Sequence, residues 1–211
     1  MTTSTLTRRV RRALATAGVG AAVALIPLAA HAATIVPIEY DAVGTSTIAK
    51  TGSDVGLGPT TLSTDLDVET GDFTGSLPLP GTRTSFKAAG FLPVQADVAF
   101  VEVAPVTGHI NLSGDIASVD ATATYNVKLS NIKVLGFPTF TGNKCQTTTP
   151  VTIPVGTEPG VGFDLTAGGR LVGEYTIGKF SNCGLNTGLI NLLVPGAGNT
   201  VEIDVSNGRF L

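Results

Sequence analysis

An alternating pattern fills residues 121–129, which read Ala121-Thr122-Ala123-Thr124-Tyr125-Asn126-Val127-Lys128-Leu129. Every second side chain, counted from Ala121, is apolar or aromatic, and the side chains between them are polar. Because successive side chains of a β-strand point to opposite faces of the sheet, this pattern predicts a strand with one dry and one wet face. Antiparallel sheets typically have one face of each kind.

The same alternation recurs at residues 62–69, 171–177 and 201–205. Turns with a glycine, which tolerates the positive φ of a tight turn, separate such runs. These turns are expected at residues 69–72, 112–115 and 167–170. The protein is therefore predicted to be all-β: an antiparallel β-sandwich or partly open barrel of roughly eight to eleven strands.

Two of the expected strands change parity along their length. Within residues 94–103 the apolar set passes from Phe100 to Val101 and Val103, and a similar slip occurs at Ser130-Asn131. A bulge or sharp bend at each point would keep the apolar side chains in the core.

One short helix is expected near the C-terminus, over residues 187–194. Leu189, Ile190, Leu192 and Leu193 recur there at helical spacing, after a possible N-cap at Thr187 and before Pro195-Gly196. We expect this helix to cover one end of the sandwich or barrel.

The first 32 residues have the pattern of a signal peptide. Four arginines between Arg8 and Arg12 precede an apolar stretch over residues 13–30, and Ala30-His31-Ala32 matches a cleavage site. The alternative is a membrane anchor, but Pro27 interrupts a stretch that is already short for a spanning helix. We therefore expect residues 1–32 to be removed and residues 33–211 to form a single β domain without a transmembrane segment.

Loss of the four leader arginines makes the remaining sequence acidic. Of 13 Lys and Arg residues nine remain, against 16 Asp and Glu, so the net charge of residues 33–211 is −7. Such a charge makes nucleic acid or an anionic bilayer a poor partner, because both bind proteins through basic groups. A soluble protein, secreted or held in the cell envelope, is expected.

Cys145 and Cys183 are the only cysteines. An even number of cysteines in an exported protein favours a disulfide. A metal or redox pair is the alternative, which the lack of a CxxC spacing and of a neighbouring histidine disfavours.

Several segments resemble a family of secreted, β-rich proteins from actinobacteria. They are residues 47–51 (TIAKT), 90–94 (GFLPV), 133–138 (KVLGFP), 183–185 (CGL) and 189–200 (LINLLVPGAGNT), and the resemblance extends over nearly all of residues 33–211. It implies an extracellular or envelope location. The family has no assigned activity, so no functional residue is carried over, and relatives often have proline where this protein has Gly188.

No catalytic centre can be recognised in the sequence. His109 is the only histidine after the leader, and alternation places it on a wet face with Asn111. A serine or cysteine nucleophile needs a neighbouring base, and a glycosidase needs two carboxylates across a sugar site. We therefore predict a protein without enzymatic activity or cofactor, and a hydrolase is the least favoured interpretation.

The densest acidic cluster is Asp65, Asp67 and Glu69, on one predicted strand face. Carboxylates in such density are a weak candidate for a calcium site. A solvated face is the favoured interpretation, because side chains along a straight strand diverge.

The remaining candidates are apolar. Phe91, Phe137 and Phe140 lie in segments broken by glycine and proline, and with Leu189 and Leu193 they could form a surface for an apolar ligand or a protein partner. Clustering around a cavity would favour a lipid or another apolar small molecule. Close packing would favour a protein partner or a structural, adhesive role.

Overall fold

The longest β-ladder of the structure joins β5 (Leu92–Asn111) to β6 (Ser118–Val134). The computed structural model describes residues 33–211 except Ala89 and residues 113–115. The expected signal peptide at residues 1–32 and the tip of the expected turn at 112–115 therefore lie outside the described residues. Within residues 33–211 the contacts form one unit.

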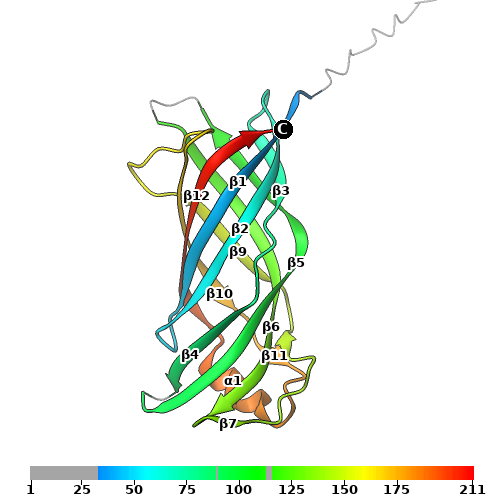
Figure 1. Ribbon diagram of the computed structural model, residues 1–211, viewed down its shortest axis with the longest axis vertical. Helices are drawn as coiled ribbons and strands as arrows, with labels where there is room; N and C mark the ends of the chain where they lie inside the picture. The colour runs from blue at the N-terminus through cyan, green and yellow to red at the C-terminus, as the bar shows by residue number, and fades with distance from the viewer. Residues whose placement is uncertain (1–32, 89, 113–115) are drawn as a thin grey trace, which may run out of the picture. The chain divides into compact units, whose positions relative to one another are not determined.

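Almost all of this unit is antiparallel strand, which confirms the predicted all-β class (Figure 1). The other strands are β1 (Ile35–Ile48), β2 (Ser53–Asp67), β3 (Asp72–Ser76), β4 (Thr82–Ala88), β7 (Phe137–Pro138), β8 (Gln146–Thr147), β9 (Val151–Thr157), β10 (Gly168–Ile177), β11 (Phe180–Ser181) and β12 (Gly196–Phe210). The described strands number 12, more than the sequence predicts, because β7, β8 and β11 are each only two residues long.

The strand pairings close into a circuit. The order β6-β9-β10-β12-β1-β2-β3-β5 returns to its start through the β5–β6 ladder, which runs from Val94↔Val134 to Asn111↔Ser118. The circuit leaves out β4, β7, β8 and β11, which pair at the end of the sheet nearer the helix. Of the two predicted architectures, the partly open barrel describes this arrangement.

The opening lies between β2 and β4. The first half of β2 approaches β4 through one side-chain hydrogen bond, from the Thr84 hydroxyl to the Asp54 carbonyl oxygen (3.1 Å). The second half of β2 instead forms a regular ladder with β3, from Ser63↔Ser76 to Leu66↔Phe73. We call the first contact the β2–β4 seam.

The expected turn glycines occupy the left-handed region. Gly71 has φ 81° between β2 and β3, and Gly168 has φ 87° at the start of β10. A side chain at either position would be strained, so glycine at these two positions fixes where the backbone reverses.

One of the two expected parity changes occurs. Asn131 takes φ 47° and the β5–β6 register shifts beside it, as predicted. In β5 the register shifts twice, between Glu102 and Ala104 and between Ala104 and Thr107. The two shifts cancel, so the buried side chains keep the same parity from Val94 to Ile110. Val101 and Val103 are therefore exposed, and the prediction that they continue the core face is wrong.

The predicted helix is present as α1 (Thr187–Leu193), preceded by a 3₁₀ turn η1 (Gly184–Asn186). Its N-cap is Asn186 rather than Thr187, whose hydroxyl instead donates to the Gly184 carbonyl oxygen (2.9 Å). No helix in the described part of the protein has the length and apolar character needed to span a bilayer.

The close approach of β9 and β10 allows a test of the strand order described above. A Cβ at Gly173 would collide with the Pro154 carbonyl oxygen, which belongs to the backbone and cannot move alone. We expect Gly173→Ala to lower the free energy of unfolding by about 1–3 kcal/mol, measured by denaturant titration.

Gly56→Ala is the matched control, because a Cβ there has its nearest neighbour, the Thr82 hydroxyl, at 3.9 Å. Equal stabilities of the two variants would contradict the close approach of β9 and β10.

Candidate functional site

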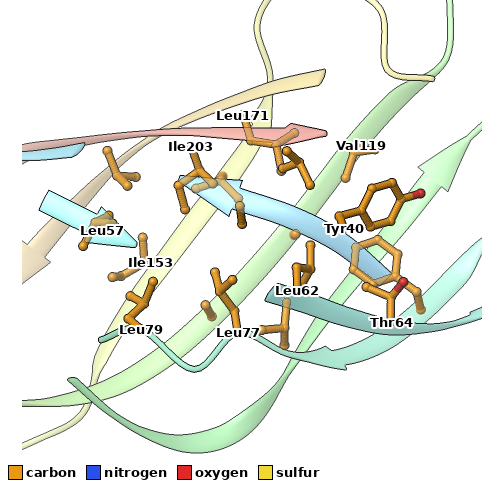
Figure 2. A pocket seen from close by; sticks show the side chains of 18 of the residues that line it. Tyr40, Leu57, Leu62, Thr64, Leu77, Leu79, Val119, Ile153, Leu171 and Ile203 are labelled. Atoms are coloured by element: carbon orange, nitrogen blue, oxygen red, sulfur yellow. The ribbon is translucent and has the colours of Figure 1, made fainter. Parts of the chain in front are cut away.

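The inward side chains of the strands enclose two apolar cavities. Figure 2 shows the first, with Leu57, Leu62, Ile153 and Ile203 around it. The centre of a water-sized sphere can occupy about 80 Å³ in each cavity. One ordered water needs only about 10–15 Å³ on this measure. Each cavity can therefore hold a group several times larger than a water molecule.

Three side chains line both cavities and divide them: Ser46, Phe100 and Tyr175. The hydroxyls of Ser46 and Tyr175 lie 2.6 Å apart, and the Ser46 hydroxyl is also 3.0 Å from the Thr200 carbonyl oxygen, to which it can donate. Phe100 meets Tyr125 edge-on, with ring centroids 6.2 Å apart. The partition thus consists of the hydrogen-bonded pair Ser46 and Tyr175 together with Phe100, which packs on Tyr125.

The tyrosines present rings, rather than free hydroxyls, to the first cavity. The Tyr125 hydroxyl donates to the Leu77 carbonyl oxygen (2.7 Å), and the Tyr40 hydroxyl to the Leu165 carbonyl oxygen (3.0 Å). Burial raises the pKa of Tyr40 to about 12, with a contribution from the Asp164 charge. Burial also raises the pKa values of Tyr125 and Tyr175. These phenols therefore stay neutral and leave an apolar wall.

The second cavity has a few polar groups beside the β2–β4 seam. Thr51, Ser53 and Thr84 line it, and the Thr51 and Ser53 hydroxyls lie 2.6 Å apart. Asn186 also lines it and donates from its side-chain amide to the Thr141 hydroxyl (3.0 Å). An apolar pocket with a small number of polar groups is the usual composition of a site for a small apolar ligand.

Helix α1 covers the second cavity. Ile190 is buried against the core, and Leu189 and Leu193 line the cavity. Asn191 holds the helix to β11 with two hydrogen bonds to the backbone of Phe180, at 2.7 and 2.9 Å. The ammonium group of Lys50 donates to the Leu192 carbonyl oxygen (3.0 Å) near the end of the helix.

The disulfide predicted from the cysteine count is present. Cys145 and Cys183 are bonded, with Cα atoms 4.2 Å apart, and both side chains are buried. Since Cys183 directly precedes η1, the bond ties the approach to α1 to the segment that follows β6. Such a bond indicates an oxidising environment.

The predicted apolar surface divides into two sets. Leu189 and Leu193 face the second cavity, whereas Phe91, Phe137 and Phe140 are not among its lining residues. These phenylalanines are 77%, 73% and 87% exposed. They neither surround a cavity nor pack closely, so neither expected arrangement describes them.

The polar candidates do not come together. Asp65 is exposed on β2, the Asp67 carboxylate accepts the Glu69 backbone N–H (2.9 Å), and Glu69 lies in the turn beyond the strand. Among the residues described, no three His, Cys, Asp or Glu side chains form a group that could hold a metal. The calcium hypothesis is therefore not carried forward.

His109 is exposed on β5, as predicted, with its ring Nδ1 3.0 Å from the Asp72 carboxylate.

Two polar residues were not identified as part of the site from the sequence: Ser46, which lines both cavities, and Asn191, which holds α1 over the second cavity. Ser46 takes an inward position between Ala42 and Ile48, and Asn191 interrupts the apolar residues of α1. A polar residue in an otherwise apolar face is the signal that could have identified both.

Comparison with known proteins finds no matching family model, no matching curated protein and no matching solved structure.

Removal of the disulfide tests its role in holding the α1 end. The bond closes a segment with a sequence separation of 38 residues, for which loop-closure entropy predicts about 4 kcal/mol of stabilisation. We expect Cys145→Ser/Cys183→Ser to lower the free energy of unfolding by up to that amount, measured by denaturant titration. Two free thiols in protein recovered from an oxidising compartment would contradict the pairing.

The tyrosines supply a spectroscopic test of the closed interior. The protein has three tyrosines and no tryptophan, so tyrosinate absorbance reports on Tyr40, Tyr125 and Tyr175 alone. In the unfolded state they ionise near pH 10, whereas in the folded state Tyr40 retains its proton to about pH 12. Their contribution to stability is full below pH 10 and is lost as the pH rises towards 12.

We therefore expect little tyrosinate absorbance from the folded protein at pH 10, and half-ionisation there in urea. Ionisation at pH 10 without unfolding would contradict the buried positions.

Proposed function

We propose that the protein is exported and acts without catalysis, by taking up an apolar ligand in its interior. The observation that carries this proposal is the pair of cavities, lined almost wholly by apolar side chains. The signal-peptide pattern, the disulfide and the resemblance to secreted actinobacterial proteins support export to the cell surface or medium.

The shape of the interior favours a narrow ligand. Ser46, Phe100 and Tyr175 divide the space, so that neither part offers more than about 80 Å³ to a water-sized sphere centre. A single aliphatic tail fits such walls better than a fused ring system. Because no strand ladder closes the β2–β4 seam, a polar end group placed there would meet the Thr51 and Ser53 hydroxyls.

The proposal is tested by filling the second cavity. Ala96 is buried on β5 and lines that cavity, so Ala96→Leu places a larger side chain in the ligand's space. Ala99 lies on the same strand but is exposed, which makes Ala99→Leu the matched control.

Native mass spectrometry and lipid extraction are applied to protein recovered from culture medium, followed by titration with dodecanoic acid. We expect one bound acyl ligand in the natural protein and in Ala99→Leu, and at least tenfold weaker binding in Ala96→Leu. A folded protein without co-purifying ligand or dodecanoic acid binding would remove the proposal and favour the structural or adhesive role.

A further inference from the structure

Positive charge is concentrated at the α1 end of the sheet. Four segments approach this end and contain all six lysines of residues 33–211, but no aspartate or glutamate: residues 42–53, 84–96, 121–157 and 175–201. Their lysines are Lys50, Lys87, Lys128, Lys133, Lys144 and Lys179. The net charge of −7 therefore conceals a basic region.

Other cations of the domain are already paired. Every ion pair between described residues uses an arginine or His109: Arg83 with Asp97, Arg170 with Glu202 and Asp204, Arg209 with Glu39 and Asp41, and His109 with Asp72. Two carboxylates border the basic region. Asp54 accepts the Thr47 hydroxyl (2.7 Å), and the pKa of Asp97 is lowered to about 2 by hydrogen bonds from Arg83 and then Asn131, with the Lys133 charge adding to the effect. No lysine takes part in an ion pair between described residues.

Large apolar side chains project at the same end. Figure 1 shows β7, α1 and the turn after β4 gathered there, with the C-terminus at the other end. Besides Phe91, Phe137 and Phe140, Leu185 and Leu192 are 89% and 69% exposed. We call these five residues the apolar tip. Exposed apolar side chains in such a group mark a surface that meets another apolar phase.

Two strand pairings and one hydrogen bond place three of the lysines close to residues of the apolar tip. Lys133 pairs with Pro138, directly beside Phe137. Lys50 contacts the backbone of Leu192. Lys87 pairs with Pro93, which places it on the ladder that leads into the turn that contains Phe91.

We propose that the α1 end docks on a lipid bilayer that contains anionic phospholipid, with the apolar tip in the interface and the lysines at the head groups. Phenylalanine and leucine side chains gain free energy by burial at the acyl boundary, and lysines are attracted to the negative surface. A second copy of this protein fits poorly, because a two-fold contact would oppose lysines to lysines. This proposal is independent of the cavity ligand.

The test is co-sedimentation with vesicles. Protein recovered from culture medium is mixed with vesicles of phosphatidylcholine alone or with equimolar phosphatidylglycerol. We expect binding to the phosphatidylglycerol vesicles, and release at about 1 M salt, where the Debye length falls to about 3 Å. Lys87→Gln/Lys144→Gln should bind about 25-fold more weakly, since each lysine near an anionic surface contributes about fivefold.

Variants at the opposite end serve as controls. Phe137→Ser/Phe140→Ser should weaken binding tenfold or more, whereas Phe210→Ser/Leu211→Ser removes two exposed apolar side chains near the C-terminus and should not. Thr107→Glu/Val161→Glu lowers the net charge by the same two units as the lysine variant, away from α1, and should bind nearly as the natural protein does. Unchanged melting temperatures show that each variant is folded.

Three results would overturn the proposal: equal binding to both vesicle types, equal losses in tip and control variants, or no sedimentation. In the last case, the same variants tested with single-stranded DNA and by analytical ultracentrifugation would identify a nucleic-acid or self-association surface instead.

Discussion

The β5–β6 ladder is the constraint on which the rest of the structure depends. It joins the two longest strands and returns the strand order to its start, so the apolar faces of eight strands share one interior. Without it, β5 and β6 would be separate edges, and their inward side chains would face water. This pairing covers the edges of β5 and β6, although the β2–β4 seam stays without a ladder, and a wall lined by Leu, Ile, Val and Ala does not fill its centre completely. The two cavities follow from this geometry.

Much of this fold could be predicted from alternation alone, because alternation reports which face of a strand is dry. It places Tyr125 and Tyr175 inward, and both are buried. Alternation carries no information about which distant strands pair, so the closing ladder and the β2–β4 seam could not be predicted. It also failed at Val101 and Val103, whose apolar character suggests a change of face, whereas the buried side chains of β5 keep the same parity from Val94 to Ile110.

The candidate surfaces were harder to predict, for two physical reasons. An exposed phenylalanine and a core phenylalanine look alike in a loop sequence, so the positions of Phe91, Phe137 and Phe140 depend on three-dimensional packing. Net charge, in turn, sums over the whole protein. Lys50 and Lys179 are far apart in sequence from Lys87 and Lys133, and only the course of the strands brings acid-free segments to one end.

Helix α1 connects the interior to that end. A helix of seven residues is too short to be stable by itself in water, and neither of its terminal turns carries a charged residue that would favour it. Tertiary contacts must therefore hold it: the disulfide at Cys183, the two Asn191 hydrogen bonds and the burial of Ile190. Its Leu193 lines a cavity while its Leu192 is exposed, so the helix is apolar on both sides. An apolar helix is expected to be surrounded by apolar material, which the interior supplies on one side only.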